Sequence, residues 1–185
     1  GDIRLDFNGT ATTNGVCHSG ANSDTTATDR DLVVCSGAPA DIAEWYPANT
    51  TVEAGDIVTL TQKTFAYQAQ GANPNTGIVE SLGNETVNIV DKATSGSKVL
   101  GIVSTAPWQT IGSDVKEAVD TSGQDLKAVP IALSGRVPVK VDPNTATIKA
   151  GDLVTLSDNG LATKTQGKGY AVGMALQDYN GSGKL

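Results

Sequence analysis

The sequence predicts an all-β protein made of duplicated small β-barrel or sandwich units, with an extended N-terminal arm. The main observation is an internal repeat: residues 51–60 (TVEAGDIVTL) return as residues 147–156 (TIKAGDLVTL) at a constant offset of 96 residues. A glycine-centred apolar segment follows each copy, at residues 99–103 and 171–175. Threonine, valine, glycine and alanine are abundant and aromatic residues make up only 4%, a composition that favours strands and turns. Because a solenoid needs three or more repeats, two copies indicate a duplicated unit, over about 51–104 and 147–176.

The N-terminal arm, residues 1–39, begins with a strictly alternating segment. Ile3, Leu5 and Phe7 share one face of a strand over residues 2–8, and polar side chains occupy the other face. In water such an apolar stripe would be an adhesive edge. We therefore expect Ile3, Leu5 and Phe7 to pair with a neighbouring subunit, the alternative being a strand folded back on its own body.

The arm also holds both cysteines, Cys17 and Cys35, in a polar stretch. An even cysteine count in an arm of this composition predicts one disulfide, which would stabilise the fold by about 3 kcal/mol in the chain-entropy model. Such a bond indicates an oxidising compartment. The alternative is two buried thiols in a cytosolic protein.

The body, residues 40–185, is predicted to consist mainly of short strands joined by turns. Gly55-Asp56 and Gly151-Asp152 are interpreted as the turns that begin the repeated strands, rather than as a symmetric metal or acid pair. The other expected elements are a helical turn over 39–46, strands over 31–35, 56–60, 64–68, 85–90 and 97–104, a loop over 71–77, a helix over 113–119 capped by Ser113, and a hairpin of 126–133 with 136–141 joined by Ser134-Gly135.

Charge and composition exclude several classes of function. The net charge of −7 argues against nucleic acid and anionic membranes as partners. The sequence contains no run of 18 apolar residues, so no membrane-spanning helix is predicted. His18 is the only histidine, so neither a metal site nor a cofactor is expected, and the sequence has no phosphate loop, nucleophile elbow or catalytic triad. The chain begins at Gly1 without a signal peptide, which predicts a processed form or an excised fragment.

Tryptophan offers one candidate binding surface. Trp45 and Trp108, with Tyr46, could form a platform on which a sugar ring stacks, although packing in a core or an interface is the commoner use of such side chains. Cell-surface glycans are the corresponding candidate partners.

Residues 41–47 (DIAEWYP) and 101–107 (GIVSTAP), followed by Ile111-Gly112, form the most specific pattern. Over residues 40–141 the chain resembles the C-terminal β domain of phage neck-appendage and tail-fibre proteins and of related bacterial surface proteins. In some relatives that domain cuts its own chain beside an Asp-x-Ala-Glu motif, and the resemblance places this role on Asp41 and Glu44, as general acid or base. Ala40 stands where a serine would be expected, which favours a structural role for both.

A second, shorter resemblance covers residues 137–140 through 172–176, which are similar to phage capsid cement proteins, the small β trimers that decorate phage heads. From these observations we expect a structural, non-enzymatic subunit of an extracellular fibre, filament or phage-like appendage, located outside the cell, on its surface or on a virion. Its expected partners are copies of itself. The alternatives are a self-cleaving maturation domain and a carbohydrate-binding module.

Overall fold

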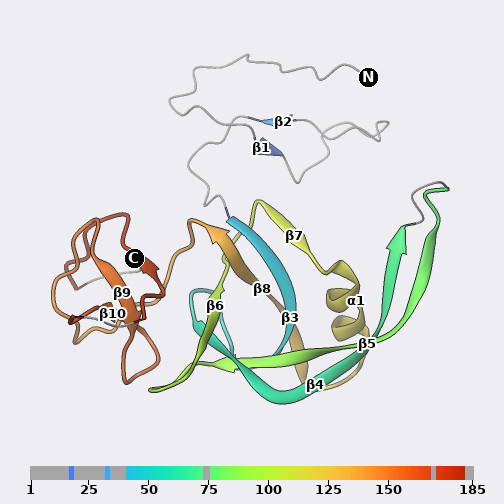
Figure 1. Cartoon of the computed structure of the whole chain (residues 1–185), viewed down its shortest axis with the longest axis horizontal. Coiled ribbons are helices and arrows are strands. Elements are labelled where there is room, and N and C mark those ends of the chain that lie inside the picture. The colour runs from blue at the N-terminus through green and yellow to red at the C-terminus, as the bar shows by residue number, and fades with distance from the viewer. Residues whose placement is uncertain (1–16, 19–31, 34–40, 73–75, 168–169, 182–185) are drawn as a thin grey trace.

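The computed structural model describes residues 17–18, 32–33, 41–72, 76–167 and 170–181, which form a mostly β structure with one short helix (Figure 1). The all-β prediction is therefore confirmed for these residues. Their strands form a six-stranded sheet, a three-stranded sheet and a two-stranded pair of β1 (Cys17–His18) with β2 (Leu32–Val33).

The six-stranded sheet has the order β5-β4-β6-β8-β3-β7, and it curves until β3 also pairs with β5 through Ala48 and Val90. The pairings of β5, β4, β6, β8 and β3 thus close into a ring. Small and β-branched side chains fill the inside of this ring, among them Val58, Val103 and Ile131. The strands are β3 (Asp41–Asn49), β4 (Ile57–Ala72), β5 (Val79–Lys92), β6 (Val99–Val103), β7 (Gln109–Ile111) and β8 (Leu126–Gly135).

Helix α1 (Ser113–Thr121) packs on one side of the ring (Figure 1). Val115 and Val119, four residues apart and therefore on one helix face, are buried against Phe65 and Ile89 of the long β4–β5 hairpin. The predicted helix is present, but the predicted cap is wrong. Gly112 is the N-cap with a φ of 76°, and Ser113 is already the first helical residue, so its side chain makes no capping hydrogen bond.

The three-stranded sheet, of β9 (Leu153–Leu156), β10 (Ala162–Lys164) and β11 (Gly173–Met174), lies on the other side of the ring (Figure 1). Its core includes Val154 and Ile148. The same cluster contains Ile57, at the start of β4, and Ala93, which directly follows β5. The two sheets are therefore joined by a shared apolar core.

The structure corrects two predicted elements. The helical turn expected over 39–46 is replaced, from Asp41 onward, by strand β3. There Asp41 and Ala43 are buried and Ile42 is exposed, which is the period of a strand and not of a helix. The expected hairpin of 126–133 with 136–141 does not form either. After Gly135 the chain crosses to the second sheet, where Val139 is buried.

Each copy of the sequence repeat begins its strand with the same turn. Gly55 and Gly151 have φ values of 84° and 91°, which only glycine adopts without steric cost. Oδ2 of Asp56 accepts a hydrogen bond at 2.8 Å from the backbone amide three residues earlier, and Oδ2 of Asp152 does the same at 2.7 Å. Both Gly-Asp pairs thus form turns at the start of their strands, as the sequence predicts.

The strands after the two turns pair in matching registers. Ile57 and Leu153, which begin the two repeated strands, are 96 residues apart in the sequence. Their pairing partners, Ile102 and Met174, are only 72 residues apart. The intervening hairpin is therefore 24 residues longer in the first copy. The matched pairs are Ile57 with Ile102, Val58 with Gly101, Leu153 with Met174, and Val154 with Gly173.

A lysine in the next strand completes each copy. Lys92 lies opposite Val58 and Lys164 opposite Val154. The ammonium of Lys92 is 3.0 Å from an Asp56 carboxylate oxygen, and that of Lys164 is 2.6 Å from Asp152. The repeat is thus a recurring set of turn, strand and ion pair.

Of the two aspartates of the repeat, Asp56 has a second lysine partner in addition to Lys92. Lys140, on the segment that leads to the second sheet, places Nζ 2.7 Å from Asp56 Oδ1, and its amide donates to the Gly55 carbonyl at 2.9 Å. Burial by itself would raise the pKa of Asp56. The hydrogen bonds from Lys140, from the Glu53 amide and from Lys92 outweigh burial and hold that pKa below its usual value.

Replacing Asp56 by alanine should therefore lower the free energy of unfolding by about 2 kcal/mol, because a buried acceptor of charged hydrogen bonds is lost from both sheets. Asp152→Ala is the matched control. Its side chain is 24% exposed, against 5% for Asp56, and it has one lysine partner instead of two, so the loss should be smaller. Urea unfolding of both variants measures the difference, and equal losses would contradict this account.

Candidate functional site

The candidate site begins where two neighbouring strands of the ring part. β6 and β8 are antiparallel, but their ladder contains only two pairs, Ile102 with Ala132 and Val103 with Ile131. Continued in the same register, residues 99–101 would face residues 133–135, yet no pair forms there. Residues 99–101 remain bonded to β4 on their other side, and residues 134 and 135 to β3. Two strand edges therefore face each other across an opening, here called the β6–β8 gap.

A β-bulge on each strand borders this gap. Val58 and Thr59 of β4 pair with Gly101 and Val99, so Leu100 is the extra residue on β6. On β8 the partners of β3 skip Leu133 in the same way. A bulge bends its strand and ends regular pairing. The two bulges explain why the ladder stops after two pairs.

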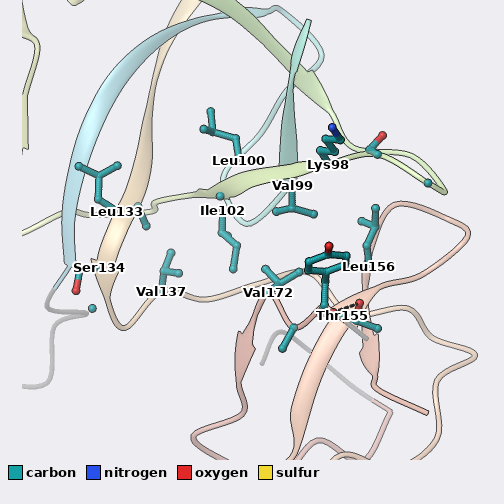
Figure 2. Close-up of a pocket in the computed structure, with 17 residues that line it drawn as sticks. Lys98, Val99, Leu100, Ile102, Leu133, Ser134, Val137, Thr155, Leu156 and Val172 are labelled. Carbon is teal, nitrogen blue, oxygen red and sulfur yellow. Dashed lines mark hydrogen bonds between the residues drawn. The ribbon is translucent and has the colours of Figure 1, made fainter. Parts of the chain in front are cut away.

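The gap opens into a groove between the ring and the second sheet, with a volume of about 1020 Å³ (Figure 2). Val99 and Ile102 point from β6 into it, toward Val172 and Leu156 of the second sheet's side (Figure 2). Lys98 is the only lysine or arginine among the lining residues, and no acidic side chain lines the groove. The groove is therefore apolar along its floor, with one basic side chain on its wall.

Gly101 keeps the strands close at the narrow end of the gap. A Cβ at this position would lie 2.7 Å from Ile131 Cγ2 and 3.1 Å from the Ala132 carbonyl oxygen. The equivalent glycine of the second copy, Gly173, has no atom within 4 Å of such a Cβ. The requirement for glycine is thus specific to the copy that carries the gap.

Asp41, one of the two candidate self-processing residues, is buried at the start of β3. Asp41 is 1% exposed, and neither of its carboxylate oxygens has a hydrogen-bond partner among the described residues. Burial raises the pKa of Asp41, and the neighbouring Ser104 hydroxyl offsets part of that rise. Ser104 is buried too, and its hydroxyl oxygen also lacks a close partner. Together they form a small polar site inside the protein.

Glu44 does not join this site. It lies three residues from Asp41 on the same strand, so the two side chains point to opposite faces and are about 10 Å apart along β3. Glu44 accepts a hydrogen bond at 3.2 Å from the Tyr46 hydroxyl. The proximity of this carboxylate adds to burial in raising the pKa of Tyr46. The geometry therefore brings Asp41 together with Ser104 and not with Glu44.

Trp45 and Trp108, the candidate stacking residues, attach to different points of β3. The Trp108 amide donates to the Asp41 carbonyl at 2.8 Å, whereas Trp45 is four residues further on, about 13 Å along the strand. Trp108 is 41% exposed, but the ammonium of Lys116 lies 5.3 Å over the ring centroid of Trp45. A cation–π contact thus occupies one face of the Trp45 indole.

The candidate interface residues Ile3, Leu5 and Phe7 lie outside the described residues, as does Cys35. The backbone of Cys17 is described and pairs with Val33 in the β1–β2 ladder. The disulfide and the N-terminal interface therefore remain predictions.

Within the described ranges, no group of three or more histidine, cysteine, aspartate or glutamate side chains could hold a metal ion. None of the helices in the same ranges is long and apolar enough to cross a membrane. Comparison with protein-family models, curated proteins and solved structures found no match for this chain. The geometry of the chain itself is thus the basis for inferring function.

Sequence reasoning missed the groove. Its lining includes Leu133 and Val137, for which the sequence predicts the two strands of a hairpin around Ser134-Gly135. One signal was available in the sequence: Pro138 lies inside the predicted strand 136–141, where a proline removes a ladder hydrogen bond.

Asp41→Asn should raise the midpoint of thermal unfolding, and the gain should be larger near pH 8 than near pH 4. Because burial raises the pKa of Asp41 above 3.8, ionisation is harder in the folded state, and wild-type stability falls as the pH rises from 3.8 through the folded pKa. Asparagine cannot ionise, so it removes this loss.

Asp56→Asn is the control of opposite sign. The pKa of Asp56 is lowered, so its stabilisation is present above 3.8 and is lost as the pH falls through the folded pKa. This variant should be destabilised, and most strongly at the higher pH. A gain for Asp41→Asn that is the same at both pH values would contradict the assignment.

Proposed function

We propose that this chain is a structural, non-enzymatic subunit of an extracellular fibre, filament or phage-like appendage. It assembles as a homo-oligomer through contacts between β-strands. In this proposal the protein supplies a stable scaffold and strand edges that a neighbour completes.

The observation that carries the proposal is the β6–β8 gap. Natural sheets protect their edges, because open backbone groups beside apolar side chains recruit further strands. Here two edges lie beside a groove of about 1020 Å³. An edge of this kind is suited to a partner in extended conformation.

The long β4–β5 hairpin supports the same function. It extends past α1 away from the ring (Figure 1), and Ile78, Val79 and Leu82 near its end are more than 60% exposed. Apolar side chains gathered at the end of an arm are typical of a contact with another protein. The arm thus provides a second region for contacts between copies.

The matching turns, registers and ion pairs of the two repeats support a finer proposal for the architecture. We infer that the body is a duplicated β unit, with one copy elaborated into the strand ring and the other reduced to the three-stranded sheet. Residues 1–39 would be an arm held by the Cys17–Cys35 disulfide. The resemblance to phage appendage and capsid cement proteins points to the same class of assembly.

Assembly of the full chain tests the function. Light scattering and negative-stain microscopy of the oxidised protein, over a wide range of concentrations, should find homo-oligomers whose mass rises with concentration. A chain that stays monomeric at every concentration would refute the proposed function.

A second candidate function, self-cleavage beside Asp41, is favoured by one observation. A buried carboxyl with a raised pKa beside a buried hydroxyl is the kind of pair that moves protons during peptide-bond cleavage, and Asp41 with Ser104 forms such a pair. In this candidate Asp41 is the general acid or base, and Glu44 is a structural residue bonded to Tyr46.

Mass spectrometry of freshly synthesised protein separates the two candidates. We expect the wild type and the variants Asp41→Asn, Ser104→Ala and Glu44→Gln to keep the full mass of the chain during incubation. A wild type that breaks next to Asp41, together with an Asp41→Asn variant that stays whole, would replace the structural proposal with self-processing. Glu44→Gln is the matched control, because its carboxylate faces away from Asp41.

A further inference from the structure

We propose that the groove beside the β6–β8 gap is the acceptor site for residues 2–8 of a second copy of this chain. This inference rests on the proposed function and specifies which segment joins one copy to the next. The donated segment is an extended strand whose apolar face covers the groove.

The backbone of the gap provides the first argument. Val99 and Gly101 pair with β4, and Ser134 and Gly135 pair with β3, whereas the facing edges of β6 and β8 form no ladder here. A strand laid against either edge gains main-chain hydrogen bonds of the kind that give affinity in strand addition. Because a strand binds through main-chain atoms, the acceptor needs an extended partner and not a helix.

The side chains of the groove provide the second argument. Apolar side chains line it from both sides, among them Val99, Ile102, Val137, Leu156 and Val172 (Figure 2). A strand that adds to the edge directs every second side chain toward this wall. Residues 2–8 have that period, since Ile3, Leu5 and Phe7 alternate with polar residues.

Charge provides the third argument. Lys98 is the only lysine or arginine among the lining residues, and Arg136 lies between two of them in the sequence. Residues 2–8 contain two aspartates and one arginine. The net side-chain charge of this segment is −1, opposite in sign to Lys98, so the attraction between them is a small contribution that should weaken at high salt.

The segment between residues 2–8 and β3 is also long enough to reach an adjacent copy. β3 begins at Asp41, which pairs with Gly135 at the border of the gap. Because Cys17 pairs with Val33 in the β1–β2 ladder, the connection consists of residues 9–17 and 33–40, which can span at most about 60 Å when extended. That length allows the first residues of one copy to reach the groove of an adjacent copy.

Photo-cross-linking of the full chain tests the assignment. Phe7 is replaced by benzoylphenylalanine, a photo-reactive residue that keeps an aromatic side chain. This variant is mixed with an excess of ¹⁵N-labelled wild type before irradiation. We expect cross-links from position 7 to residues 97–102 or 132–137, and we expect the cross-linked peptides of the groove to carry ¹⁵N.

A matched pair of variants gives an independent measurement. Leu133 lines the groove and Leu153, on β9, does not, although both leucines are 52% exposed and lie in strands. Leu133→Glu should weaken self-association at least tenfold, whereas Leu153→Glu should change it less than twofold. Circular dichroism checks that both variants keep their β structure, as expected for exposed positions.

Each outcome has a distinct meaning. Cross-links to the groove within the same copy, or cross-links to another surface such as the hairpin end at Ile78, overturn this inference, while the presence of oligomers preserves the proposed function. Equal effects of Leu133→Glu and Leu153→Glu also overturn it. The absence of any oligomer refutes the proposed function itself.

Discussion

One buried carboxylate, that of Asp56, connects the parts of the described body. It closes the turn before β4, receives Lys92 from β5, and receives Lys140 from the segment that leads to the second sheet. The next residue, Ile57, is buried in the core that both sheets share. A polar anchor beside an apolar one fixes the distance between the ring and the second sheet, because neither contact can shift without straining the other.

This arrangement also accounts for the open place in the ring. Ile102 of β6 packs on its outer face against the core of the second sheet, while Val103 next to it faces the inside of the ring. A short strand that serves two cores is held from both faces. Beyond these residues, bulges at Leu100 and Leu133 turn β6 and β8 apart. The gap thus lies where the ring meets the second sheet.

Local rules were sufficient to predict the repeated turns, since a glycine suited to positive φ and an aspartate that binds its own backbone are visible over a few residues. They also located the short helix, although its N-cap is Gly112 and not the predicted Ser113. They failed where long-range packing decides the outcome. Ser134-Gly135 has the composition of a hairpin turn, yet burying Val139 in the second core directs the chain across to the other sheet. The partnership of Asp41 with Ser104 joins residues 63 positions apart, so no local spacing could reveal it. The Asp-x-Ala-Glu pattern instead suggested Glu44, which the strand period places on the opposite face.

Where the strands of the two sequence repeats match in register, they differ in the length of one hairpin. In the second copy, Ser157 and Leu161 close a short turn between β9 and β10, whereas the first copy adds 24 residues between the matching strands without altering the register or the ion pair at their base. The pair of strands therefore tolerates large insertions at its far end. In the second copy that end is bound to the rest of the body: Asp158 accepts a hydrogen bond from Ser95, Asn159 donates one to Asp142, and a Cβ at Gly160 would lie 2.3 Å from the Ala93 carbonyl oxygen. The long hairpin of the first copy, which already carries 24 added residues, is therefore the better place to graft an epitope or an affinity tag.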